Sequence, residues 1–428
     1  MEVTRRYLLI GGIASSVSAI AFTQSRPAGI LGTRTADRRT GVILDVRQFG
    51  ARGDGRSDDR VAIQRAIDEA TRVGGGTVHL PAGTYAVSRA APSAFAILLR
   101  SGVFLEGTGR SSVVKLQAGS GGHLINVTRE ANCGIRGMVL DGNRLEQPSL
   151  GHGFRSGGVD GLQLEDLLIV NAFHYGIGLE GGDNRGVVIR RVEIADCGGD
   201  GIDIKNKSND NSIVTISDVS VRRWGLRTDS QTQAGIDCRG PVRLSGIRVS
   251  NPVADDAVGV RMRQGEIGDV NGLGAHNARL ENFDVQMGNG RTQVGVDVVA
   301  RSVVAANGTV SGGFRGLAVH ASGFRANGVR VSGCSGSGIL LNAHGSGLNA
   351  DDAVLSNCTV TNCADDGIDV ETNNVQILDC TSTGSGRYGL SVRETASGTV
   401  VIRGNFSRNR AGSFFNRGRN SRFAVSAP

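Results

Sequence analysis

A five-residue unit recurs along the chain, with glycine first, mostly apolar residues at its second and fourth positions, and variable residues at its third and fifth. Successive units begin between 21 and 36 residues apart. Spacing of this length and irregularity is typical of a solenoid, because propeller blades repeat at a nearly fixed period. The units begin at Gly153 (a degenerate copy), Gly176, Gly201, Gly235, Gly259, Gly295, Gly316, Gly338, Gly367 and Gly389.

The alternation within each unit predicts a strand, in which neighbouring side chains point to opposite faces. The second and fourth residues should point into a core and stack on their equivalents in the next coil. Further short apolar alternations lie between the units, for example around Val188 and Ile216. Two or three strands in each repeat, joined by turns rich in Gly, Asn and Asp, predict an all-β fold, a parallel β-helix solenoid over residues 42–403.

A helical pattern precedes the first unit. Asp58 or Asp59 can cap a helix over residues 58–72, with Ile63, Ile67 and Ala70 on one face. Solenoids need a cover over the open end of the core. We therefore expect an N-terminal capping α-helix.

Composition narrows the class of partner only a little. Glycine accounts for 65 of 428 residues, roughly twice the usual share, which fits repeated turns. Lys and Arg outnumber Asp and Glu by 47 to 40, a net charge of +7. This charge attracts polyuronate, nucleic acid and anionic lipid alike. The seven cysteines form no Cys-x-x-Cys pair, so we expect buried small side chains, with disulfides as the alternative and no zinc site.

The two ends of the chain differ from the repeats. Residues 1–21 resemble a twin-arginine signal peptide, with Arg5 and Arg6 ahead of a short apolar run and small residues near Ala21. Residues 22–41 read as a flexible leader and residues 404–428 as a basic C-terminal tail. We expect a periplasmic or secreted bacterial protein without a membrane span in its mature form.

Several stretches between residues 44 and 144 resemble the opening segment of pectate-lyase-superfamily β-helices. They are LDVRQFGARGDG from Leu44, GGGTVHLPAGTY from Gly74, VFLEGTG from Val103 and LDGNR from Leu140. Polygalacturonase-like proteins, phage tailspikes and mannuronan C5-epimerase modules share this opening, and the likeness is closest to the epimerase modules. The resemblance implies a right-handed coil, which is also the usual hand of parallel crossovers.

The catalytic motifs of these families are incomplete here. Epimerase modules carry Tyr-Gly-Phe-Asp-Pro-His and an Asp one coil later, whereas this chain keeps only Tyr175-Gly176 of the motif and has Lys205 near the later position. Residues 199–203, which include Asp200 and Asp203, resemble a polygalacturonase motif. In polygalacturonases an Asp-Asp pair follows one coil later. Here residues 233–237 stand in that place, and Asp365-Asp366 comes several coils later.

The third and fifth residues of the units should form the outward face, and their charges concentrate on the coils from Gly176 to Gly259. Our catalytic candidates are Lys205, Arg239, Tyr175, Asp203, Asp237 and Asp200. Our substrate-binding candidates are Glu180, Arg261, Arg263 and His174, and His152 is a further candidate for proton transfer. The alternative is a solvated face of mixed charge without a function.

β-Elimination from a uronate needs its carboxylate neutralised, a base for the C5 proton and an acid for the leaving oxygen. Lys205 can be the base only if cationic neighbours or burial lower its pKa. Arg239, Arg261 and Arg263 could bind the uronate carboxylate in a bidentate manner. Lyases of this superfamily use Lys/Arg pairs on adjacent coils, so the resemblance implies the same role for Lys205 and Arg239. Asp203 and Asp237 could instead hold Ca²⁺, or act as acid and base in an inverting hydrolase.

These observations predict an exported β-helix enzyme that acts on an anionic, uronate-containing polysaccharide by β-elimination or C5-epimerisation. An inverting glycoside hydrolase of polygalacturonase type and a non-catalytic glycan-binding β-helix remain the alternatives. We expect no required cofactor, although Ca²⁺ would fit the chemistry, and no nucleic acid as a partner.

Overall fold

The computed structural model describes residues 41–425, apart from residues 150, 183, 207–212, 228–232, 265–273, 344 and 346. The predicted signal peptide and leader lie outside the described residues. The described part belongs to one compact unit that begins at Gly41. None of its helices is long and apolar enough to cross a membrane.

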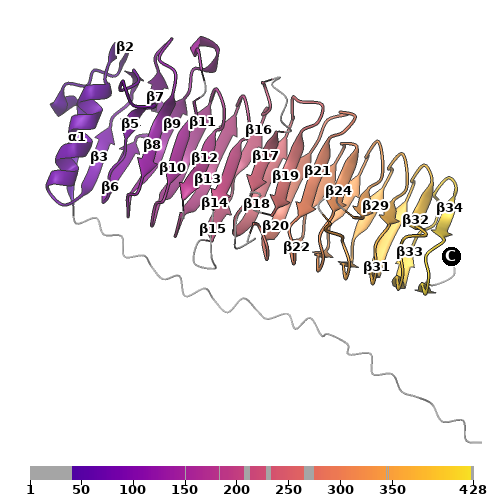
Figure 1. The fold of residues 1–428 in the computed structure, drawn as a ribbon. Coiled ribbons are helices and arrows are strands. Elements are labelled where there is room, and N and C mark those ends of the chain that lie inside the picture. Colours follow the sequence, from indigo (N-terminus) through magenta and orange to yellow (C-terminus); the bar gives the residue numbers. More distant parts are fainter. Residues whose placement is uncertain are drawn as a thin grey trace, which may run out of the picture. The chain divides into compact units, whose positions relative to one another are not determined.

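One α-helix, α1 (Arg60–Arg72), lies at the start of the solenoid (Figure 1). Ile63, Ile67 and Ala70 are fully buried, so the predicted apolar face is confirmed, and the helix contacts β1, β3, β4, β5 and β6. Asp59 is the N-cap residue, but its side chain makes no capping hydrogen bond. The Asp59 carboxylate accepts hydrogen bonds from the backbone N–H groups of Arg52 and Gly53, whereas Asp58 accepts one from the N–H of Arg60 at 3.1 Å. The ordered loop before the helix therefore depends on Asp59.

Two parallel sheets wind along the described residues. A 13-stranded sheet contains the repeat units, and the other, with 22 strands, contains the remaining segments of each coil. The first sheet consists of β5 (Phe95–Leu98), β8 (His123–Thr128), β10 (Phe154–Gly157), β12 (Ile177–Gly182), β14 (Ile202–Asn206), β17 (Ala234–Cys238), β19 (Val258–Arg263), β21 (Val294–Val299), β24 (Arg315–Val319), β27 (Ile339–Leu341), β30 (Ile368–Val370), β32 (Tyr388–Val392) and β34 (Gly412–Asn416).

The second sheet consists of β1 (Val42–Asp45), β2 (Asp54–Asp58), β3 (Gly76–Leu80), β4 (Gly83–Val87), β6 (Val103–Gly107), β7 (Ser112–Leu116), β9 (Gly134–Asp141), β11 (Gln163–Val170), β13 (Val188–Ala195), β15 (Val214–Ser217), β16 (Ser220–Arg222), β18 (Val242–Ser250), β20 (Arg279–Gln286), β22 (Val304–Ala306), β23 (Thr309–Ser311), β25 (Arg325–Asn327), β26 (Arg330–Ser332), β28 (Val354–Ser356), β29 (Thr359–Thr361), β31 (Gln376–Thr383), β33 (Val400–Asn405) and β35 (Arg422–Ala424). Among the described residues, 3-10 turns cover Val46–Phe49, Gly109–Ser111 and Arg144–Glu146.

The register of the first sheet confirms the predicted stacking. Ile177 pairs with Ile202, Ile202 with Ile236, and Ile236 with Val260, and all four side chains are fully buried. Each coil therefore stacks its apolar residues on those of the preceding coil. The fold is the predicted right-handed parallel β-helix with an N-terminal capping helix.

The coils continue past residue 403, where the sequence predicted a tail. Strand β34 pairs with β32, and β35 pairs with β33. The rings of Phe406, Phe414 and Phe423 pack in sequence, with centroids 5.1 and 5.3 Å apart. Residues up to Ala424 therefore form part of the solenoid.

The seven cysteines are buried free thiols. This confirms the prediction that they fill the core as small side chains, and the alternative of disulfides is wrong for this structure.

Candidate functional site

The predicted site residues lie on the outward face of four neighbouring strands. Asp203 and Lys205 belong to β14, and Asp237 lies on β17 directly opposite Asp203. Arg239 follows β17, and its backbone N–H bonds to the carbonyl oxygen of Ile204. The structure therefore brings these side chains together on adjacent coils, as the register predicted.

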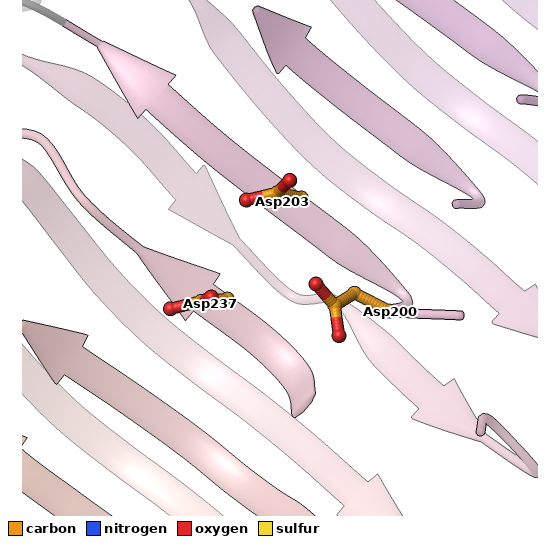
Figure 2. Close-up of side chains that lie close together, drawn as sticks. All are labelled: Asp200, Asp203 and Asp237. Atoms are coloured by element: carbon orange, nitrogen blue, oxygen red, sulfur yellow. The ribbon is translucent and has the colours of Figure 1, made fainter. Parts of the chain in front are cut away.

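Three carboxyl groups form the buried layer of this site. One oxygen atom from each of Asp200, Asp203 and Asp237 lies within 4.8 Å of the other two. Figure 2 shows Asp203 and Asp237 on neighbouring strands and Asp200 just ahead of β14. All three side chains are buried, and Asp203 is completely inaccessible to solvent. The alternative of a solvated, mixed-charge face is therefore wrong at these positions.

Two cationic side chains lie beside these carboxylates. The Nζ atom of Lys205 is 3.0 Å from Oδ2 of Asp203 and 2.8 Å from Oε1 of Glu180. Nη2 of Arg239 is 2.7 Å from Oδ1 of Asp203. The side chains of Lys205 and Arg239 remain 25% and 14% exposed, so their charges are closer to solvent than the carboxylate of Asp203.

Two further arginines extend the row of cations along the solenoid. Arg263 binds the Asp237 carboxylate through Nε at 3.2 Å and Nη2 at 2.5 Å. Arg155 donates from Nε to Glu180 at 3.1 Å. Sequence reasoning missed Arg155, although it occupies the third position of the degenerate unit at Gly153. Partly exposed cations on successive coils therefore lie beside the buried carboxylates.

Arg261 lies opposite Asp237, as the register predicted, but its side chain is largely buried. Its side chain is 10% exposed, and its Nε lies 3.6 Å from Oδ2 of Asp297 on the next coil, three coils beyond Asp203. The geometry therefore places Arg261 mainly in packing between coils, and leaves Arg239 and Arg263 as the better candidates for binding an anion.

The electrostatics of Lys205 contradict its predicted role as a base. Burial lowers its pKa, but the contacts with Asp203 and Glu180 raise it more, so the net pKa lies above the ordinary value. The arginines that were expected to lower this pKa are themselves held by Asp203 and Asp237. Lys205 is therefore a permanent cation at neutral pH and can neutralise a negative charge.

Asp200 is the member of the cluster suited to holding a proton. Burial raises its pKa well above the usual range, and the nearby Asp237 and Asp203 raise it further. Its Oδ1 accepts a hydrogen bond from the N–H of Ala234 at 2.6 Å. A buried carboxyl group of this kind can serve as an acid at pH values where a solvated aspartate is ionised.

Tyr175 lies in a stack of aromatic rings beside Lys205. Its ring centroid is 3.7 Å from that of His174 and 4.7 Å from that of His152. The Nζ atom of Lys205 is 5.2 Å from the same ring. Burial, followed by the charge of Asp203, raises the pKa of Tyr175, so the phenol keeps its proton.

The two histidines beside Tyr175 differ in their availability. Nδ1 of His152 accepts the backbone N–H of Tyr175 at 3.3 Å, and its Nε2 faces Oε2 of Glu180 at 3.5 Å. Both nitrogen atoms of His152 are thus engaged within the protein. Burial, helped by the neighbouring His152, lowers the pKa of His174 to about 3, so His174 is neutral at pH 7 and is a weak base in the free protein.

A resident calcium ion does not fit the predicted pair of aspartates well. Both oxygens of Asp203 already contact Lys205 and Arg239, and both oxygens of Asp237 contact Arg263. Calcium prefers six to eight oxygen ligands, and it would have to displace these cations. We therefore derive no step through a metal ion.

Two family models match the chain. The model described as "Rhamnogalacturonase A/epimerase, pectate lyase-like" matches residues 43–237, which include the buried carboxyl layer. The model described as "Right handed beta helix region" matches residues 315–425.

Curated relatives match the chain only in part. The chain is 41% identical over 167 residues to mannuronan C5-epimerase AlgE6 of Azotobacter vinelandii, a match that covers 37% of this chain and 17% of the epimerase. It is 40% identical over 125 residues to alginate lyase 7 of the same organism, covering 27% of this chain and 15% of the lyase. The matches thus span under one fifth of these relatives.

Solved structures match over most of the chain. The A-module of the Azotobacter vinelandii epimerase AlgE6 has a TM-score of 0.55 at 22% identity and covers 90% of this chain and 100% of the module. The N-terminal fragment of bacteriophage phi29 gene product 12 has a TM-score of 0.63 at 21% identity and covers 88% of this chain and 70% of the fragment. At these identities the likeness shows the fold alone. The chain is a right-handed parallel β-helix protein, and its residues 43–237 are similar to the pectate lyase-like family model.

Proposed function

We propose that the protein acts on a uronate-containing polysaccharide, as a lyase or a C5-epimerase, at the outward face of β12, β14, β17 and β19. The row of partly exposed cations beside buried carboxylates is the observation that carries this proposal. Coils about 4.8 Å apart match the length of a pyranose unit closely enough for a polyuronate to lie along the axis. The similarity to epimerases and an alginate lyase supports the same substrate class.

The cations supply the charge that both reactions need. Removal of the C5 proton builds negative charge on the uronate carboxylate, and fixed cations stabilise that charge. Arg239 and Arg263 can bind a carboxylate in a bidentate manner. Because Asp203 and Asp237 already hold their guanidinium groups, little side-chain entropy is lost when the polymer binds.

Both reactions begin when a base takes the C5 proton. In elimination, the electrons of the C5–H bond form a C4–C5 double bond, the C4–O4 bond breaks, and an acid protonates O4. In epimerisation, a proton returns to C5 from the opposite face. Neutral His174 can accept the first proton, because a bound anion beside it raises its proton affinity. Tyr175 and Asp200 keep protons to donate.

Inverting hydrolysis is the second candidate. Asp200, with its raised pKa, lies beside the carboxylates of Asp203 and Asp237. A protonated acid next to an ionised carboxylate is the pairing that glycoside hydrolysis uses. Hydrolysis would create new reducing ends without an unsaturated sugar.

We also propose that the protein works outside the cytoplasm. The Arg5-Arg6 pair and the apolar run after it support export, and an extracellular polysaccharide would be found there.

A screen of the purified protein against polymannuronate, polyguluronate and polygalacturonate tests the main proposal. Ultraviolet absorbance reports a lyase, reducing ends without absorbance report a hydrolase, and a changed uronate composition without cleavage reports an epimerase. We expect absorbance or epimerisation with at least one polymer. Cleavage without absorbance would transfer the assignment to hydrolysis, and binding without any reaction would leave a glycan-binding protein.

A further inference from the structure

The arrangement around Asp200 and Asp203 occurs a second time, near the C-terminal end of the same sheet. Asp366 precedes the unit at Gly367 as Asp200 precedes the unit at Gly201, and Asp369 holds the third position as Asp203 does. The N–H of Tyr388 binds Oδ1 of Asp366 at 3.0 Å, as the N–H of Ala234 binds Asp200. The Asp365-Asp366 pair noted in the sequence belongs to this second arrangement.

The arginine of the first arrangement is also repeated. Arg393 is the fifth residue of its unit, as Arg239 is, and its Nε and Nη2 bind the Asp369 carboxylate at 2.7 and 2.8 Å. Burial raises the pKa of Asp366, as it raises that of Asp200. The two arrangements thus share a buried aspartate with a raised pKa and an arginine bound to the aspartate at the third position of the unit.

Three substitutions distinguish the second arrangement from the first. Ser391 stands at the position of Asp237, Glu371 at that of Lys205, and Tyr388 at that of Ala234. The second arrangement therefore lacks the carboxylate and the lysine proposed for the reaction, and it has a tyrosine ring that can pack against a sugar.

Partly exposed aromatic rings lie next to exposed arginines at this second arrangement. The rings of Tyr388 and Phe415, both half-buried, have centroids 5.2 Å apart. The guanidinium carbon of Arg417 lies 5.1 Å from the Phe415 ring centroid, and that of Arg387 lies 5.9 Å from the Tyr388 ring centroid. Aromatic faces pack against the C–H faces of sugar rings, and arginine recognises carboxylates.

The charge of the neighbouring segment selects an anionic ligand. Residues 404–428 contain five arginines and neither Asp nor Glu. Arg408, Arg410 and Arg417 are all exposed. A local excess of positive charge attracts a polyanion and repels cationic surfaces.

We propose that Tyr388, Phe415, Arg387, Arg393 and Arg417 form a second binding site for the same uronate polysaccharide, which holds the polymer without reacting with it. This inference rests on the proposed function. Asp203 and Asp369 are six strand positions apart in one sheet, a separation of about 29 Å at about 4.8 Å per coil. A polymer that reaches both sites binds more tightly than a short oligosaccharide that reaches one.

Binding measurements on two variants test this site. We would measure the dissociation constants of long polymannuronate and polygalacturonate, and of the corresponding trisaccharides, for Arg417→Ala and for Phe415→Ala. Arg417 is exposed, so its replacement should leave the fold intact. The control is Arg403→Ala, which removes another exposed arginine from the other sheet, where it pairs with Asp379.

We expect each variant to bind its polymer at least about 10-fold more weakly, with trisaccharide binding and the Arg403→Ala control unchanged. Unchanged polymer affinity, or equal losses for polymer and trisaccharide, would overturn this inference and leave the proposed function in place. A change in oligomeric state without loss of polymer binding would assign the surface to contacts between copies and also overturn it. Wild-type protein that binds neither polyuronate would remove both proposals.

Discussion

The ammonium group of Lys205 lies 2.8 Å from Oε1 of Glu180 on the preceding coil. This contact, together with the one to Asp203, keeps the lysine charged although burial disfavours the charge. The side chain therefore acts in this account as a fixed cation beside the substrate carboxylate, and the base must be another group.

Replacing Lys205 with methionine should lower the rate at least about 100-fold, the usual scale for losing one stabilising group. Stability should also fall by about 1–3 kcal/mol, because buried Asp203 loses one of its two cationic partners. The double variant Lys205→Met/Asp203→Asn should recover part of that stability without recovering the rate. Initial rates and thermal unfolding measure both effects, and a double variant as active as wild type would show that the cation is not needed.

Asp200→Asn should stabilise the protein in alkaline solution. The folded state holds the Asp200 proton more tightly than the unfolded chain, so the wild type loses stability as the pH rises from about 3.9 through the raised pKa. An amide resembles the protonated carboxyl group and does not ionise. The gain in melting temperature should therefore be larger at pH 8 than at pH 4. A gain that is equal at both pH values would mean that the proton on Asp200 does not control stability.

Chelation of divalent cations should leave the activity unchanged. The oxygens of Asp203 and Asp237 already bind Lys205, Arg239 and Arg263. Rates measured with excess EGTA and with added CaCl₂ should agree within about twofold. Loss of activity in EGTA that is restored by calcium would contradict this arrangement of ion pairs as the active form.

Export should depend on the arginine pair near the N-terminus. Changing Arg5 and Arg6 together to lysine should leave the full-length protein in the cytoplasm, whereas the wild type should appear outside it, shortened near Ala21. Fractionation and N-terminal mass analysis would measure this. Equal secretion of the two proteins would reject the twin-arginine route.

The sequence was sufficient to predict the fold and the stacking of the site residues. The repeated glycine and the alternating apolar residues define the register, because a shift by one residue would expose Ile177 and Ile202. The same register correctly places Asp203 beside Asp237. The strands after residue 403 were missed because the exposed arginines of this segment resemble a tail, although Phe414 and Phe423 pack at the end of the core.

The charge state of the site could not be predicted from the repeats. The outward position of Asp203 indicated exposure, but the side chains around it leave no part of it in contact with solvent. The pKa of Lys205 depends on its close contacts with Asp203 and with Glu180, 25 residues earlier in the chain. The repeat places Glu180 and Lys205 at equivalent positions of successive coils, but it does not give the distances between their charged atoms. Rotamers and long-range ion pairs therefore decide which groups can act as acid or base.

The behaviour of the hydrogen at C5 of the uronate tests the central claim most directly. Polymannuronate and polygalacturonate would be incubated in D₂O with wild-type protein and with Tyr175→Phe, and analysed by NMR. We expect the wild type to form C4–C5 unsaturated ends or to incorporate deuterium at C5 of at least one polymer. Tyr175→Phe should be at least about 100-fold slower while it keeps its fold, because the ring that stacks on His174 remains. New reducing ends from the wild type, with C5 still protonated and no unsaturated product, would contradict the account.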